Sequence, residues 1–175
     1  MAAQRFADEL NEQISREFAA HQQYLAAAVY YDRLTMPKMA GLFYAQALEE
    51  RQHAMMMVQY LLDTDARVMI PGIEAPVIEF ADIAAPVALA LAQEKRVTQQ
   101  IYALTQTARE EMDFGSEQFM QWFIKEQVEE VASMTSLLAV VDRSHDDIRA
   151  IEEYVAAELG AESPDPTAPA GAGYA

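Results

Sequence analysis

The stretch AQALEERQHAMMMVQYL, Ala45 to Leu61, decides the fold because charged groups interrupt an apolar helical stripe there. Apolar residues recur at helical spacing over residues 38–62, and Glu50 falls on the same stripe. His53 follows Glu50 by three residues, so both side chains emerge from one face of the helix. The stretch therefore predicts a long helix that carries a carboxylate and an imidazole into a protein core.

Three further stretches have the same design, with a long apolar stripe and a polar residue near its middle. They cover residues 5–34, 86–113 and 116–143. Their inward-facing polar residues are Glu17, Glu94 and Gln127. Ser116 is the expected N-cap of the last of these helices, because its hydroxyl can accept from an unpaired backbone N–H. A short fifth helix is expected over residues 147–159, and Gly160 ends it.

The lengths of the connections select the topology. The first two long helices are joined by a few residues, as are the last two, so each pair should form an antiparallel hairpin. Residues 63–85 form a longer link that reaches about 65 Å when extended. A helix of about 25 residues is only about 37 Å long, so the link can run the full length of a bundle. We predict an all-α fold, a four-helix bundle with one long crossover and a short fifth C-terminal helix.

The domain organisation follows from the composition along the chain. We expect one domain over residues 1–159, since 175 residues suffice for one well-buried domain. The final segment, residues 160–175, reads GAESPDPTAPAGAGYA and has little that could build a core. It is predicted to be a flexible Pro/Ala/Gly tail.

Charge and composition exclude several classes of function. The formal net charge is −16, which argues against nucleic acid and anionic membrane surfaces as partners. Disulfides, thiolate metal sites and cysteine nucleophiles are excluded because the chain has no cysteine. The N-terminus lacks the layout of a signal peptide, and no apolar run approaches the roughly 20 residues of a membrane-spanning helix. We expect a cytoplasmic protein.

Acidic residues on several inward-facing stripes indicate a metal site. A buried ionised carboxylate is expensive unless it finds a partner, and no Lys or Arg lies on these inner arcs. A multivalent cation between the helices resolves the problem most simply. Carboxylate oxygens with one imidazole suit iron or manganese, and less often zinc. A lone Glu-x-x-His pair is common without a metal, so the coincidence on four helices carries the prediction.

The sequence resembles the ferritins, in particular the bacterial non-haem ferritins and the actinobacterial proteins of the bacterioferritin B type. The resemblance rests on REFAAHQQYLA around Glu17, the stretch around Glu50 and His53, and EQFMQWFIKEQVEEV around Gln127 and Glu130. It implies a ferritin-like bundle and a role in iron storage and detoxification. Dioxygen or hydrogen peroxide would oxidise Fe(II) at a di-iron ferroxidase centre within each subunit. The ferric mineral would be stored in a hollow shell of twenty-four identical subunits.

The resemblance also implies roles for individual residues. One iron would be held by Glu17, Glu50 and His53. The second would be held by Glu94 and Glu130, with Glu50 bridging the two irons and Gln127 at the border. A possible third iron site would use Glu49, Glu126 and Glu129, together with Glu130. Tyr24 would supply an electron or a hydrogen bond, and Trp122 is a weaker candidate for the same part.

Departures from related patterns narrow the subclass. Haem-containing bacterioferritins carry Glu-x-x-His on two helices and a Met directly after the ligand Glu of the second helix. Here Arg51 follows that glutamate, and the fourth helix offers Gln127-x-x-Glu130. Haem is therefore not expected. The same substitution argues against rubrerythrins and di-iron oxygenases, which usually keep both Glu-x-x-His pairs.

Three alternatives differ in what they require. A purely structural bundle would bind no metal. A DNA-protecting mini-ferritin of twelve subunits would take its ligands from two subunits and would typically lack the fifth helix. A soluble di-iron oxygenase would need a substrate pocket beside the metals. In the twenty-four-subunit shell, the fifth helix would instead line the fourfold axis, with an apolar plug made of Ile148, Ile151, Val155 and Leu159.

Overall fold

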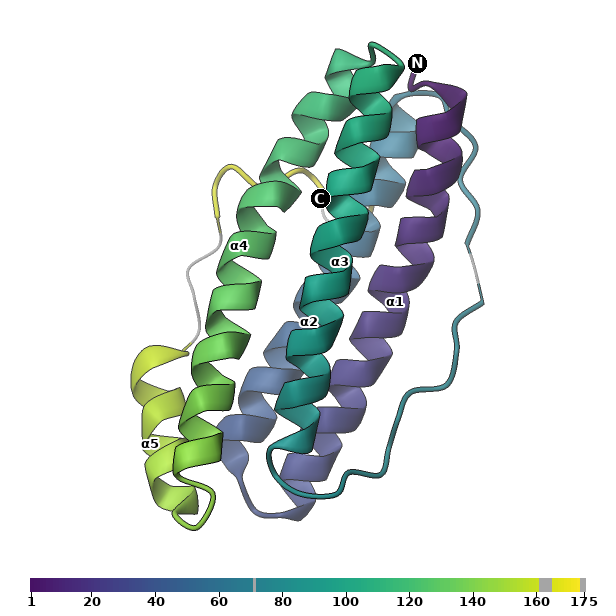
Figure 1. Ribbon diagram of the computed structural model, residues 1–175. Coiled ribbons are helices and arrows are strands. Elements are labelled where there is room, and N and C mark those ends of the chain that lie inside the picture. Colours follow the sequence, from purple (N-terminus) through teal and green to yellow (C-terminus); the bar gives the residue numbers. More distant parts are fainter. Residues whose placement is uncertain (71, 161–164, 174–175) are drawn as a thin grey trace.

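Five helices account for most of the chain in the computed structural model, which describes residues 1–70, 72–160 and 165–173. The helices are α1 (Gln4–Arg33), α2 (Pro37–Asp63), α3 (Ala85–Glu110), α4 (Phe114–Arg143) and α5 (Ile148–Glu158). The four long helices lie side by side in a bundle, and α5 lies beside one end of α4 (Figure 1). No strand occurs in the described residues. The prediction of an all-α bundle with a short fifth helix is confirmed.

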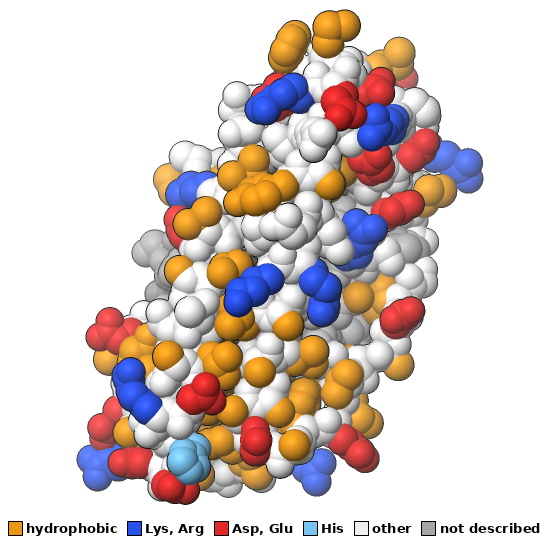
Figure 2. All heavy atoms as spheres, viewed as in Figure 1, with side chains coloured by type: hydrophobic (Ala, Val, Ile, Leu, Met, Phe, Trp, Pro, Cys, Tyr) orange, Lys and Arg blue, Asp and Glu red, His pale blue; other side chains and the backbone are white. Residues whose placement is uncertain are grey.

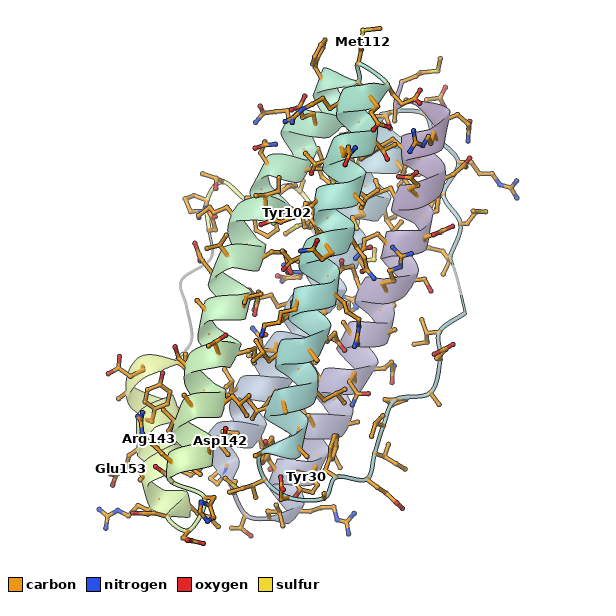
Figure 3. All side chains as sticks on the ribbon, viewed as in Figure 1. Tyr30, Tyr102, Met112, Asp142, Arg143 and Glu153 are labelled. Carbon is orange, nitrogen blue, oxygen red and sulfur yellow. The ribbon has the colours of Figure 1, made fainter. Side chains whose placement is uncertain are left out.

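The first three helices end in the same way, with one residue in the left-handed region. Thr35, Asp65 and Met112 have φ values of 59°, 55° and 53°. At each end the next residue donates its N–H to a carbonyl five residues earlier, which satisfies an otherwise unpaired group. Met112 marks the tip of the turn between α3 and α4 (Figure 3). These tight ends reverse the chain within a few residues after α1 and α3.

The link between α2 and α3 is the predicted crossover, and it runs along α1 to the opposite end of the bundle (Figure 1). Two amide side chains of α1 hold it. Asn11 donates to the carbonyl of Arg67 at 2.9 Å and accepts from the N–H of Met69 at 2.7 Å. Gln23 donates to and accepts from the backbone of Val77, at 2.9 Å in both directions. Each amide thus satisfies backbone groups that have no strand partner.

The core consists of two apolar clusters, one toward each end of the bundle. One is built around Tyr31, Phe43 and Leu137, and the other around Phe6, Leu61 and Phe123. On each long helix the inward polar residues predicted from the sequence fall between the members of the two clusters; they are Glu17, Glu50, His53, Glu94 and Gln127. The bundle therefore has a polar layer at mid-length, closed by apolar packing on both sides.

The start of α4 differs from the prediction. Asp113 is the N-cap, and its carboxylate accepts from the backbone N–H of Ser116 at 3.1 Å and from its hydroxyl at 2.7 Å. α4 therefore begins at Phe114, and α3 ends earlier than predicted, at Glu110. Both Asp and Ser are favoured capping residues, so residue type alone did not decide between them.

Two residues of the apolar stripe of α5 pack inside their own subunit, and the predicted plug at a fourfold axis between subunits stays a prediction. Ile151 and Val155 are 0% and 3% exposed and belong to the core cluster of the bundle, while Ile148 is 45% exposed. Glu152 accepts from the backbone N–H groups of Lys38 and Met39, both at 2.9 Å. The carboxylate thus caps the start of α2, where the helix leaves its N–H groups unpaired.

The described part of the tail, residues 165–173, lies against the bundle. Asp165 accepts from the indole N–H of Trp122 at 3.2 Å and from Lys125 at 3.1 Å. Ala172 donates its N–H to the carbonyl of Met55 at 3.0 Å. The predicted flexibility of the tail stays a prediction, and residues 161–164 and 174–175 lie outside the described residues.

The surface is mixed in character on the face that α3 and α4 form. Acidic, basic and apolar side chains are interspersed there (Figure 2). Among the described residues, no helix has both the length and the apolarity needed to cross a membrane.

Candidate metal centre

The polar layer brings together six side chains from the four long helices, all at most 5% exposed. They are Glu17 of α1, Glu50 and His53 of α2, Glu94 of α3, and Gln127 and Glu130 of α4. Helical periodicity places each one on the inward face, because each stands at the spacing of its helix's buried residues. Lys and Arg are absent from the buried side chains of the described residues.

One half of the layer is a compact group of three potential ligands. Glu17, Glu50 and His53 offer atoms that all lie within 4.8 Å of one another. His53 Nδ1 lies 3.7 Å from Glu50 Oε2. Glu17 Oε2 and His53 Nε2 are buried without a hydrogen-bond partner. Buried polar atoms are almost always paired, so these orphaned atoms suit a cation that is bound here.

The other half of the layer centres on Glu94. The Tyr24 hydroxyl donates a short hydrogen bond to Glu94 Oε1, and Gln127 Nε2 donates to Glu94 Oε2 at 3.3 Å. Glu130 completes this half and accepts from Gln46 Nε2 at 3.3 Å. The residues expected around a second iron therefore lie in the same buried layer as the first group.

Burial dominates the electrostatics of the layer. It raises the pKa of Glu50 well above its usual value, and the charges of Glu94 and Glu17 raise it further. Burial also raises the pKa of Glu94 to about 7, and raises that of Glu130. The pKa of the His53 imidazole falls to about 4 for the same reason. Burial thus favours the protonated form of the carboxyl groups and the neutral form of the imidazole, and a cation that binds here would displace protons.

Two aromatic side chains border the layer. Tyr24 is 1% exposed, and burial raises the pKa of its hydroxyl well above the usual value, so the group keeps its proton and donates to Glu94. The Trp122 ring lies edge-on to the His53 ring, with centroids 5.5 Å apart. Trp122 also binds Asp165, so the tail contacts the side chain that packs on His53.

A second group of potential ligands adjoins the first. Glu49, His53 and Glu126 offer atoms within 4.8 Å of one another, and the two glutamates are only partly buried. Glu129 is not part of this group. Its side chain is 52% exposed and pairs with Lys125 at 3.7 Å. Of the four residues expected at a third iron site, Glu49 and Glu126 lie in this group, and His53 joins them.

Several neighbours of the polar layer were not singled out from the sequence. Gln13, Gln46 and Thr98 each contact a residue of the layer. The spacing of four residues between Gln13 and Glu17 was a usable signal, since side chains at that spacing meet on a helix. The contacts of Gln46 and Thr98 cross between helices, and a helical pattern does not fix such pairs.

Two surface depressions lie away from this layer. One of about 580 Å³ is lined by α3 and α4 residues that include Tyr102 and Arg109, and Tyr102 stands on the outer side of α3 (Figure 3). Another of about 570 Å³ lies between α1 and α3 and includes Arg5 and Glu110. Neither is lined by a residue of the polar layer.

Comparison with known protein families agrees with a helical bundle that carries a metal centre. The family described as "Ferritin-like domain" matches residues 7–144, which span almost all of the four long helices. The chain belongs to the ferritin family. The resemblance read from the sequence is therefore confirmed.

Individual ferritins agree with the chain over nearly its full length. Ferritin BfrB of Mycolicibacterium smegmatis is 54% identical over 166 residues, which cover 95% of this chain and 92% of that protein. The bacterial non-heme ferritin of Staphylococcus aureus is 33% identical, with 94% and 99% covered. An open pore ferritin structure from Archaeoglobus fulgidus superposes with a TM-score of 0.87 at 29% identity, with 93% of this chain and 100% of that chain covered.

Proposed function

We propose that this ferritin oxidises Fe(II) at the buried polar layer and stores the ferric product, which makes it an iron storage and detoxification protein. The main support for this proposal is the composition of the layer. Four carboxylates and an imidazole meet at mid-bundle with no buried Lys or Arg to balance them among the described residues. Fe(II) ions supply the missing positive charge, and carboxylate and imidazole ligands suit them.

Two iron positions share the layer in this proposal. Glu17, Glu50 and His53 hold the first iron, which the distances among their atoms support. Glu94 and Glu130 hold the second, and Gln127 borders it. Glu50 bridges the two positions in this proposal. It belongs to the first group, and the charges of Glu94 and Glu130 raise the pKa of its carboxyl group.

The chemistry is a two-electron oxidation. Each Fe(II) gives up one electron, and dioxygen takes up two electrons and two protons to become hydrogen peroxide. Hydrogen peroxide in place of dioxygen accepts two electrons and two protons and yields two water molecules. Anionic carboxylate oxygens favour the higher charge of Fe(III). Tyr24 holds Glu94 in place through its hydrogen bond and keeps its own proton.

A route away from the centre is offered by the second ligand group. We assign a third iron position to Glu49 and Glu126, with His53 beside them, since the two glutamates are partly exposed and lie next to His53 of the first position. Glu129, which pairs with Lys125, takes part only if that ion pair opens.

The store requires an assembly. The family match and the solved ferritin structures support a multimeric shell, and we propose twenty-four identical copies and a cytoplasmic location. α5 contributes to the shell from a position already docked on its own subunit.

Aerobic loading of the purified protein with Fe(II) tests the function. We expect a ferric absorbance to develop. The protein should elute as one large species on size exclusion, and negative-stain images should show hollow particles with electron-dense cores. A monomer or dimer that gains no ferric absorbance would contradict both oxidation and storage.

A further inference from the structure

Thr98 stands at the junction of three polar groups beside the second iron position. It lies on α3, one turn after Glu94, and faces Gln127 of α4. Its hydroxyl oxygen is 2.8 Å from the backbone carbonyl of Glu94 and 2.9 Å from Gln127 Oε1. The other end of the same amide, Gln127 Nε2, is 3.3 Å from the Glu94 carboxylate.

A hydroxyl carries a single hydrogen, so Thr98 donates to only one of its two neighbours at a time. The two ends of the Gln127 amide are nearly equal in shape, and a half-turn of the amide exchanges them. Two arrangements therefore fit the same positions of the heavy atoms.

In the first arrangement Thr98 donates to Gln127 Oε1, and Gln127 Nε2 donates to the Glu94 carboxylate. In the second arrangement Thr98 donates to the backbone carbonyl of Glu94 and accepts from Gln127 Nε2. Gln127 Oε1 then faces the position beside Glu94. Both arrangements leave the buried amide nitrogen with an acceptor, which matters because Gln127 is only 4% exposed.

We propose that Thr98 is a positioning residue that lets the Gln127 amide turn its oxygen toward the second cation. The inference rests on the proposed metal function of the layer. Without a cation, the amide nitrogen donates to Glu94. When a cation binds at Glu94, an N–H facing it is repelled, and the half-turn presents an oxygen ligand instead. Thr98 switches from donor to acceptor and keeps the amide satisfied.

Removal of the hydroxyl breaks this exchange. In Thr98→Val the second arrangement would leave a buried N–H without an acceptor, which is rarer in proteins than an under-satisfied carbonyl. The amide then stays with its nitrogen toward Glu94, and the second position loses an oxygen ligand. Loss of a group that orients a ligand typically weakens metal binding about tenfold or more.

Calorimetric titration of the assembled, metal-free protein with Zn²⁺, which has no redox chemistry, tests the proposal. Glu94→Ala identifies the binding step that belongs to the second position. We expect Thr98→Val to weaken that step about tenfold and leave the Glu17-dependent step unchanged. Thr98→Ser keeps the hydroxyl and should restore the wild-type affinity. Thr98→Ala supplies the same comparison with a smaller side chain if the valine variant does not fold.

A double variant separates positioning from packing. If Thr98 acts through the amide, its replacement by Val should have no further effect on the second step in a Gln127→Leu background. An unchanged second step in Thr98→Val, or a full effect that persists without the amide, would overturn the proposal. Failure of the proposed function has a different signature, namely a wild-type protein whose Zn²⁺ binding does not depend on Glu50.

Discussion

Gln13 Nε2 lies 2.7 Å from Glu17 Oε1, one helical turn apart on α1, and both side chains are buried. Arg16 donates to the oxygen end of the same amide at 3.1 Å, which fixes the amide so that its nitrogen faces Glu17. One carboxylate oxygen of Glu17 is thereby held, and Oε2 is left without a hydrogen-bond partner. The carboxylate is oriented before a cation arrives, which lowers the entropic cost of binding.

Gln13→Leu should therefore weaken cation binding without removing a ligand. We expect the affinity of the Glu17-dependent step to fall about tenfold to a hundredfold, the range typical of partners that orient metal ligands. Zn²⁺ titration by calorimetry measures this directly. Gln22→Leu, on a partly exposed position of the same helix, is the matched control and should bind Zn²⁺ as the wild type does. Equal affinities in Gln13→Leu and wild type would contradict the orienting role.

The metal-free protein should lose stability as the pH rises from about 5 to about 8. Burial raises the pKa of Glu94 from 4.5 to about 7, so the folded protein holds this proton over a range in which the unfolded chain releases it. The raised pKa values of Glu50 and Glu130 act in the same direction. The lowered pKa of His53, about 4, opposes them below pH 6.5.

Thermal unfolding in the presence of a chelator measures this slope. Glu94→Gln removes one of the carboxyl groups and keeps the shape, so its melting temperature should fall less steeply between the same pH values. A wild-type protein that gains stability over this range, or a Gln variant with an unchanged slope, would be inconsistent with protonated carboxyl groups in the layer of the metal-free protein.

Cation binding should release protons, and more of them at lower pH. At pH 6 the Glu94 carboxyl, with its pKa of about 7, is mainly protonated in the metal-free protein, and binding must displace that proton. At pH 8.5 most of the proton is already gone. Zn²⁺ titrations in buffers of different ionisation enthalpy count the protons released. Release that does not change between the two pH values would argue that Glu94 is not a ligand.

Ile151→Ala should destabilise the subunit through loss of core packing. Ile151 is fully buried between α5 and the bundle, and truncation of such a residue typically costs about 2–5 kcal/mol. Ile148 lies one turn earlier and is 45% exposed, so Ile148→Ala serves as the control and should cost less than about 1 kcal/mol. Denaturant unfolding at one fixed protein concentration compares the two. A larger loss in Ile148→Ala would mean that α5 packs mainly on another subunit.

The fold was largely predictable because helical periodicity fixes the direction of side chains. Glu50 and His53 stand on the apolar stripe of α2, so a helix that buries this stripe also buries them. The crossover was predictable from length alone. The end of α3 and start of α4 were not, because Asp113 and Ser116 both suit a cap and only the folded geometry selects Asp113.

Contacts between helices set the limits of the sequence prediction at the site. Each candidate ligand follows from its own helix, but the hydrogen bond from Thr98 to Gln127 depends on how α3 and α4 pack. The hydrogen bond between Asp165 and Trp122 could not be predicted either, since a Pro/Ala/Gly-rich segment shows no periodicity. The stripe of α5 predicted a buried face correctly but did not reveal which surface would bury it.

Single-turnover oxidation tests the central claim, that the layer around Glu50 oxidises Fe(II). Metal-free protein is mixed in air with two Fe(II) per subunit, and ferric absorbance is followed by stopped flow. Glu50→Ala removes the proposed bridge and should slow the initial rate at least about tenfold. Glu129→Ala, an exposed glutamate paired with Lys125, should keep the wild-type initial rate. An unchanged initial rate in Glu50→Ala would contradict the account.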